Sequence, residues 1–151
     1  MNLLPLLLNR LGNTARVAVA RVLTAGLYYP WRACEKLSGQ SLGCVAHCHH
    51  LLRDIFRKLG PSWPVCVAFQ NPVSRGRSLR MRLDLCEITQ LAYFRDAGRY
   101  EEQWLLVIAD AIKHARCFVD IGAHFGHYAM AIAQASPGKR VIAVETAPEN
   151  V

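Results

Sequence analysis

Two glycines and two acids near the end of the chain have the types and spacing needed to hold a polar ligand against the backbone. Asp120 closes a short apolar run, Gly122 and Gly126 follow it, and Glu145 closes a second apolar run. A glycine lets the chain turn sharply and approach a ligand closely, because it has no side chain. The N–H groups that begin a helix suit a carboxylate or a phosphate. An acid at a strand end can accept hydrogen bonds from vicinal ribose hydroxyls. These residue types therefore point to a nucleoside ligand.

The elements that must position these residues form a strand, a helix and a second strand. Residues 117–121 are nearly all apolar, which is typical of a strand buried in a parallel sheet. Residues 128–135 predict a helix, and residues 140–145 predict the second strand. Residues 101–115 predict a preceding helix, with apolar residues at helical spacing: Trp104, Ile108, Ala111, Ile112 and Ala115. This order predicts the opening βαβ unit of a doubly wound α/β sheet, which binds ligands at the carboxyl ends of its strands.

The preceding part of the chain predicts helices and a hairpin. Residues 1–60 predict two or three basic helical segments, broken near Pro30 and at Gly39–Gly43. Residues 65–70 and 79–85 predict two strands, and the second strand alternates strictly between apolar and polar residues. We therefore divide the chain into a helical lead-in, residues 1–60, and an α/β part, residues 61–151.

Two ligands compete for the glycine-rich turn. The dinucleotide fingerprint is G-x-G-x-x-G, whereas this chain has G-A-H-F-G, with His124 in place of the middle glycine. The pattern D-x-G-x-x-x-G, with polar His124 and Tyr128 beside the turn, better suits the amino-acid end of S-adenosylmethionine. Plain alternatives stay open: Asp120 caps the turn through backbone N–H groups, and His127 lies on the helix surface.

Three segments resemble the FkbM-type S-adenosylmethionine-dependent methyltransferases. They are YFRDAGRYEEQWL, CFVDIGAHFGHYAMAIA and GKRVIAVETAPENV. In that family a G-x-Y-E segment precedes a helix, a D-h-G-A-x-x-G-x-Y segment ends a strand, and P-x-N follows the acid of the next strand. The resemblance covers residues 65–151. It departs from the pattern at His124, where Asn is frequent, and at Thr146 and Ala147.

The resemblance implies a class I methyltransferase (Rossmann-like) sheet, here incomplete, that binds S-adenosyl-L-methionine. It implies that Tyr128 lies near the methionine carboxylate, that Glu145 binds the ribose, and that Glu101 approaches the same pocket. The residues that it assigns to the cofactor turn are Asp120, Gly122, Ala123, His124 and Gly126.

The activity that the resemblance implies is O-methyl transfer to a hydroxyl of a sugar, a lipid or another small molecule. A complete sheet of this type needs several more strands after Glu145. We therefore expect the chain to be the front part of a longer protein and to be inactive alone. The acceptor site and any catalytic base would lie downstream, so no catalytic residue is assigned.

The charge distribution leaves two other function classes open. Residues 1–82 hold 12 Lys/Arg against 2 acids, a net charge of +10, and residues 83–151 hold 6 against 9, a net charge of −3. A basic front half could bind nucleic acid, although few aromatic residues interleave its arginines. The acid-free, arginine-bearing residues 1–30 could instead be an organellar transit peptide or contact a membrane surface, while the plainer interpretation is a packed helical lead-in.

The six cysteines indicate reduced core thiols in a cytoplasmic-type compartment, because their spacing is irregular. Cys44, His47 and Cys48 would share one helix face, which leaves a three-ligand metal site as the minor hypothesis. It lacks a second ligand pair at the spacing of structural zinc sites, and the favoured interpretation is a plain amphipathic helix.

Overall fold

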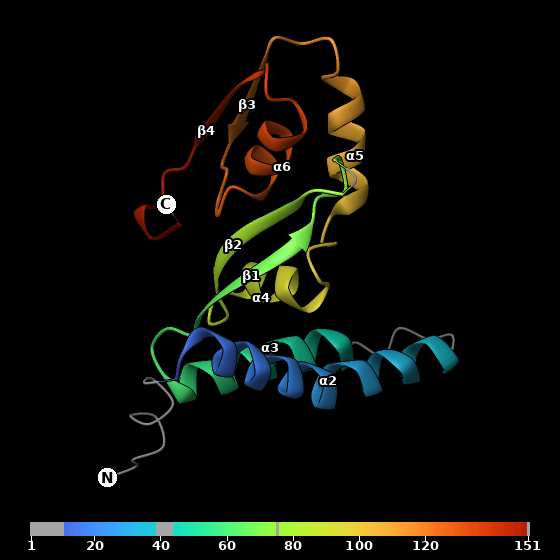
Figure 1. The fold of residues 1–151 in the computed structure, drawn as a ribbon. Coiled ribbons are helices and arrows are strands. Elements are labelled where there is room, and N and C mark those ends of the chain that lie inside the picture. Colours follow the sequence, from blue (N-terminus) through green and yellow to red (C-terminus); the bar gives the residue numbers. More distant parts are fainter. Residues whose placement is uncertain (1–10, 39–43, 75, 151) are drawn as a thin grey trace. The chain divides into compact units, whose positions relative to one another are not determined.

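The computed structural model describes residues 11–38, 44–74 and 76–150. It is a mixed α/β structure with two small sheets (Figure 1). Contacts divide it into two compact units. Unit 1 comprises the described residues within 1–67 and 82–96, and unit 2 comprises those within 68–81 and 97–150. Each strand of the hairpin therefore contributes to both units, so the division falls inside the hairpin and not at residue 60.

Unit 1 is built on two helices that pack together, α2 (Asn13–Ser38) and α3 (Cys44–Leu59). Their buried residues recur at helical spacing: Ala20, Thr24 and Tyr28 in α2, and Cys48, Leu52 and Phe56 in α3. Apolar residues three or four apart lie on one face, so each helix buries a single stripe.

Helix α2 continues through Pro30, where the sequence predicted a break. A proline removes one backbone donor, and its ring crowds the carbonyl four residues earlier. That earlier residue is Gly26, and both residues are exposed. The break predicted at Gly39–Gly43 lies outside the described residues.

The hairpin strands are β1 (Pro64–Gln70) and β2 (Ser78–Asp84), and β2 buries alternate residues as the sequence predicted. Leu79, Met81 and Leu83 are buried, while Arg80 and Arg82 are exposed. Helix α4 (Ile88–Arg95) follows, and the Glu87 carboxylate caps it by accepting a hydrogen bond from the Gln90 N–H at 2.7 Å.

Unit 2 contains the predicted βαβ unit. Strands β3 (Cys117–Ile121) and β4 (Arg140–Val144) pair in parallel, with Asp120 opposite Ala143 and Ile121 opposite Val144. Helix α6 (His127–Ala135) connects the strands and contacts both. The hairpin tip is tied to α6, because the Asn71 side-chain amide donates to the Ala131 carbonyl at 3.0 Å and to the Gln134 side chain at 2.9 Å.

In α5 (Glu102–Ala111) the buried residue is Leu105, while Trp104 is 58% exposed. Two burial predictions from the sequence are wrong. One face of the β3–β4 sheet is open, and Ile121 on that face is 82% exposed. The described cysteines are free thiols, but not all lie in the core: Cys48 and Cys86 are buried, and Cys34, Cys66 and Cys117 are exposed.

Candidate functional site

The turn after β3 is tied to the end of β4. The Gly122 and Ala123 N–H groups both donate to the Val144 carbonyl, at 2.8 and 3.0 Å. Gly122 and Gly126 have φ values of 77° and 76°, and His124 between them has a φ of 51°. Glycine adopts this left-handed region without strain, whereas a residue with a side chain does so at a cost. The glycine spacing thus builds a tight turn with its backbone at the carboxyl edge of the sheet.

The carboxylate of Glu145 crosses from the end of β4 to this turn. One oxygen accepts a hydrogen bond from the His124 N–H at 2.6 Å, and the other accepts one from the Ala147 N–H at 2.7 Å. The pKa of Glu145 lies below its ordinary value, mainly because of the Ala147 N–H and then because of the His124 N–H. Glu145 is therefore a carboxylate at neutral pH.

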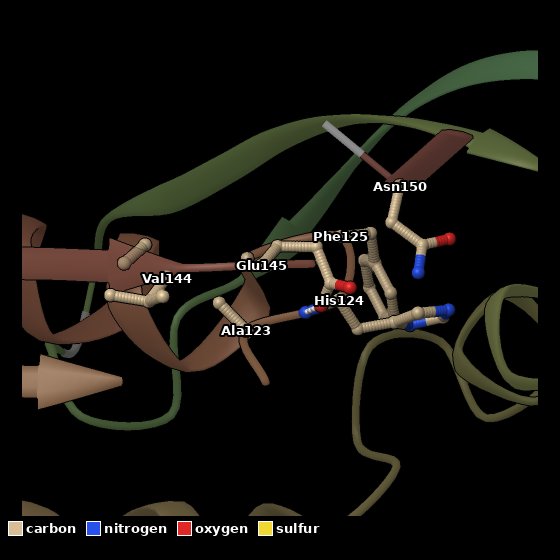
Figure 2. Close-up of a pocket in the computed structure, with 8 residues that line it drawn as sticks. Ala123, His124, Phe125, Val144, Glu145 and Asn150 are labelled. Atoms are coloured by element: carbon tan, nitrogen blue, oxygen red, sulfur yellow. Dashed lines mark hydrogen bonds between the residues drawn. The ribbon is translucent and has the colours of Figure 1, made fainter. Parts of the chain in front are cut away.

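A pocket of about 490 Å³ opens at this edge, with side chains from the turn, the end of β4 and the short helix η1 (Pro148–Asn150) (Figure 2). Its lining residues are Ala123, His124, Phe125, Gly126, Ala143, Val144, Glu145 and Asn150. The lining combines one carboxylate, polar groups and apolar side chains, which is the composition of a site for a small organic ligand.

Four residues assigned to the site from the sequence line this pocket: Ala123, His124, Gly126 and Glu145. Phe125 and Asn150 line it as well, although the sequence interpretation did not assign them. The P-x-N segment was a signal for Asn150, whose side chain hydrogen-bonds Glu145 and helps to lower its pKa. Nothing in the spacing marked Phe125.

Asp120 is used by the backbone of α6. Its carboxylate accepts a hydrogen bond from the Ala129 N–H at 3.2 Å, within the first turn of the helix. Burial raises the pKa of Asp120, and the Ala129 N–H partly opposes this rise. This geometry favours the capping interpretation of Asp120, since the side chain satisfies a helix-end donor and is absent from the pocket lining.

Glu101 and Tyr128 meet each other outside the pocket lining. The Tyr128 hydroxyl donates to a Glu101 oxygen at 3.0 Å. Glu101 has a left-handed backbone with a φ of 58° at the start of α5. Burial raises the pKa of Tyr128, and Glu101 raises it further. The resemblance implied that Glu101 approaches the cofactor pocket. In the structure Glu101 contacts Tyr128, and neither residue lines the pocket.

His127 is buried, with 7% of its surface exposed, so its predicted position on the helix surface is wrong. Its ring stacks on Phe125, with centroids 5.0 Å apart and an interplanar angle of 19°. Burial lowers the pKa of His127 to about 4, and His124 contributes to this shift. His127 is therefore neutral at pH 7, and its ring packs against Phe125, which lines the pocket.

The metal hypothesis gains no support from the described residues. Among them, no group of three or more His, Cys, Asp or Glu side chains could hold a metal ion. His47 is exposed and Cys48 is buried, while the side chain of Cys44 lies outside the described part.

Comparison with protein-family models, with curated proteins and with solved structures finds no match for this chain. The geometry of the pocket and the resemblance of the three segments are therefore the basis for a function.

Proposed function

We propose that the chain carries the cofactor half of a Rossmann-like, S-adenosylmethionine-dependent methyltransferase. One observation carries the proposal: the Glu145 carboxylate closes β4 and faces the glycine turn of β3 at a pocket on the carboxyl edge of a parallel pair. Such an edge is where doubly wound sheets bind nucleotides. In this proposal Glu145 accepts hydrogen bonds from the ribose hydroxyls.

The turn favours S-adenosylmethionine over a dinucleotide. In G-x-G-x-x-G the second glycine lets the pyrophosphate approach the backbone, and the third lets the helix pack closely. Here His124 and His127 hold those positions, and the His124 side chain lines the pocket. A pyrophosphate would meet a side chain there, whereas the amino-acid end of S-adenosylmethionine, which is joined through a sulfonium, does not need that contact.

The proposed reaction moves a methyl group from the sulfonium to a hydroxyl oxygen. The carbon–sulfur bond breaks with its electron pair left on sulfur, a carbon–oxygen bond forms, and the hydroxyl proton leaves. The protein contributes mainly by holding donor and acceptor in line. By the family resemblance, the acceptor is a hydroxyl of a sugar, a lipid or another small molecule.

Calorimetric titration of the 151-residue chain with S-adenosylmethionine, S-adenosylhomocysteine and NAD tests the proposal. We expect saturable binding of the first two ligands and no heat from NAD at the same concentrations. Binding of NAD alone would replace the proposal with a dinucleotide site. Absence of binding by all three ligands to a chain that is folded by circular dichroism would remove the nucleoside site altogether.

A further inference from the structure

The outward face of α2 is apolar along most of its length. Val22 is 71% exposed, Leu37 is 88% exposed and Tyr29 is 50% exposed, with its hydroxyl donating to the Arg95 carbonyl of α4 at 3.0 Å. At 100° per residue these three positions fall within one stripe of the helix, opposite the buried Ala20 and Thr24. The smaller exposed residues of the same stripe are Ala18, Ala25, Gly26 and Ala33.

Cations border this stripe, and one acid, Asp96 just after α4, lies 3.8 Å from Arg32. Lys36 lies within it, and Arg21 and Arg32 lie along one side; all three residues are exposed. The single acid in α2 is Glu35, which the same helical spacing places toward the buried side. The sequence contains no acid before Glu35. A solvated helix face is normally polar, so an apolar stripe with a cationic border is suited to a partner.

We propose that this outward face of α2 binds the surface of membranes that contain anionic lipids. Apolar side chains in one stripe can enter the boundary between headgroups and acyl chains, and flanking cations can contact anionic headgroups. None of the helices in the described part of the chain is long and apolar enough to cross a membrane. The contact is therefore one in which α2 lies along the surface.

Charge distinguishes a lipid surface from a second copy of this chain. In a pair of α2 helices joined by this face, Lys36 and the bordering arginines of both copies would gather at the seam. Asp96 pairs with Arg32, but among the described residues no ion pair involves Arg21 or Lys36, and like charges brought together oppose association. An anionic lipid surface supplies the missing negative charge.

Flotation of the whole chain with vesicles tests the proposal. We expect the chain to float with vesicles of phosphatidylcholine and phosphatidylglycerol, to float poorly with phosphatidylcholine alone, and to be released by raised salt. The double variant Val22→Asp, Leu37→Asp should stay in the dense fraction. Its matched control is Val107→Asp, Ile121→Asp, which places the same charges at residues of unit 2 that are 60% and 82% exposed. The control should float like the parent chain.

A second pair of variants tests the cationic border at equal net charge. Arg21→Gln with Lys36→Gln should lower the partition coefficient by about 25-fold, since each cation near an anionic surface contributes about a fivefold factor. Lys113→Gln with Arg116→Gln removes two exposed cations from unit 2 and should have a much smaller effect. Helix content by circular dichroism should be equal in all variants, because each substituted residue is exposed.

Three results would overturn the proposal. The first is that the folded chain does not float with anionic vesicles. The second is that the unit 2 controls lose as much binding as the α2 variants. The third is a dimer in sedimentation velocity that Val22→Asp, Leu37→Asp dissolves, because the face would then be covered by a second copy. The inference does not depend on the cofactor assignment, since no residue of α2 lines the pocket.

Discussion

At the scale of single residues, Glu145 joins the turn to the end of β4 and also offers the pocket its carboxylate. Its two oxygens already accept the His124 and Ala147 N–H groups. The Asn150 side chain also hydrogen-bonds Glu145, so a ribose would have to replace that contact, while the bonds to the backbone orient the acceptor before a ligand arrives. Such preorganisation lowers the cost of binding.

Replacing Glu145 should weaken S-adenosylmethionine more than it weakens the fold. Loss of hydrogen bonds to a charged acceptor should make Glu145→Ala raise the dissociation constant roughly 10- to 100-fold. Glu145→Gln retains one acceptor and should fall between the parent and Glu145→Ala. Calorimetry with S-adenosylmethionine measures both variants, and urea unfolding measures their stability.

The control for the Glu145 prediction is a cofactor analogue without the ribose hydroxyls. This analogue should bind the parent chain and Glu145→Ala almost equally. If the analogue and the parent cofactor lose affinity by the same factor in Glu145→Ala, the carboxylate does not contact the ribose. Its role would then be limited to holding the turn.

Burial of His127 predicts a loss of stability in mild acid. The folded pKa of about 4 lies below the ordinary histidine pKa of 6.5, so the unfolded chain binds the proton first as the pH falls. The contribution of neutral His127 is therefore complete above pH 6.5 and is lost as the pH falls toward 4. The slope for one such residue is at most about 1.4 kcal/mol per pH unit.

Urea unfolding of the parent chain, His127→Phe and His114→Phe at pH 7 and pH 5 measures this slope. His127→Phe should flatten it, and the exposed His114 serves as the control. Some slope should remain from His49, whose pKa burial also lowers to about 4. An unchanged slope in His127→Phe would show that another group controls acid stability.

The sequence could predict the residues whose role follows from the local backbone. Gly122 and Gly126 were predictable because the turn needs positive φ values, and Glu145 was predictable because it ends an apolar strand. The burial of His127, whose ring lies against Phe125 and Tyr128, was not predictable from the helical spacing of α6. The choice between capping and ligand binding for Asp120 depends on where α6 begins, and one residue of shift would change it.

At the scale of elements, the connection from α4 to α5 is held against β1 at Gly98. Gly98 has a φ of 79°, and a Cβ atom added there would lie 2.5 Å from the Phe69 Cβ. Gly122 and Gly126 have similar φ values, but an added Cβ atom at either one would meet nothing within 4 Å. The three glycines thus separate the cost of backbone strain from that of steric overlap.

Substituting each glycine by alanine should reveal this difference. Gly122→Ala and Gly126→Ala should each lower the free energy of unfolding by about 1 kcal/mol, from backbone strain alone. Gly98→Ala adds overlap with Phe69 and should cost roughly 2–4 kcal/mol. Urea unfolding measures all three variants. Equal losses at the three positions would mean that Phe69 does not pack on Gly98 as described.

The sequence predicted the positions of those elements whose apolar residues follow a single regular pattern. The alternation in β2 and the apolar runs of β3 and β4 predicted those strands to within one residue. The helix predicted over residues 101–115 is α5, which ends earlier, at Ala111. The sequence predicted a break at Pro30, whereas α2 continues through this residue.

At the scale of the whole molecule, helix α6 covers one face of the β3–β4 sheet. The other face of this sheet is apolar and exposed. Val119 and Ile142 are partners across this face, and Ile121 and Val144 are the next pair. Their exposed fractions range from 36% to 82%. Parallel sheets are usually covered on both faces, so this surface favours self-association of the isolated chain.

A lysine on the open face should reduce that association without harming the fold. Ile121→Lys should raise the monomer fraction in sedimentation velocity and change the free energy of unfolding by less than about 0.5 kcal/mol, because the residue is exposed. Ile132→Lys, at a residue 1% exposed, should unfold unit 2. If Ile121→Lys leaves the monomer fraction unchanged, the chain associates through another surface.

The most direct test of the cofactor site is an NMR titration of the ¹⁵N-labelled chain with S-adenosylhomocysteine. The account predicts that the largest amide shift changes occur at His124, Gly126 and Ala147, the backbone groups around Glu145. The amide chemical shifts of the buried α2 residues Ala20 and Thr24 should not change. Shift changes confined to residues outside the pocket, or none at saturating ligand, would contradict the assignment of this pocket to the nucleoside.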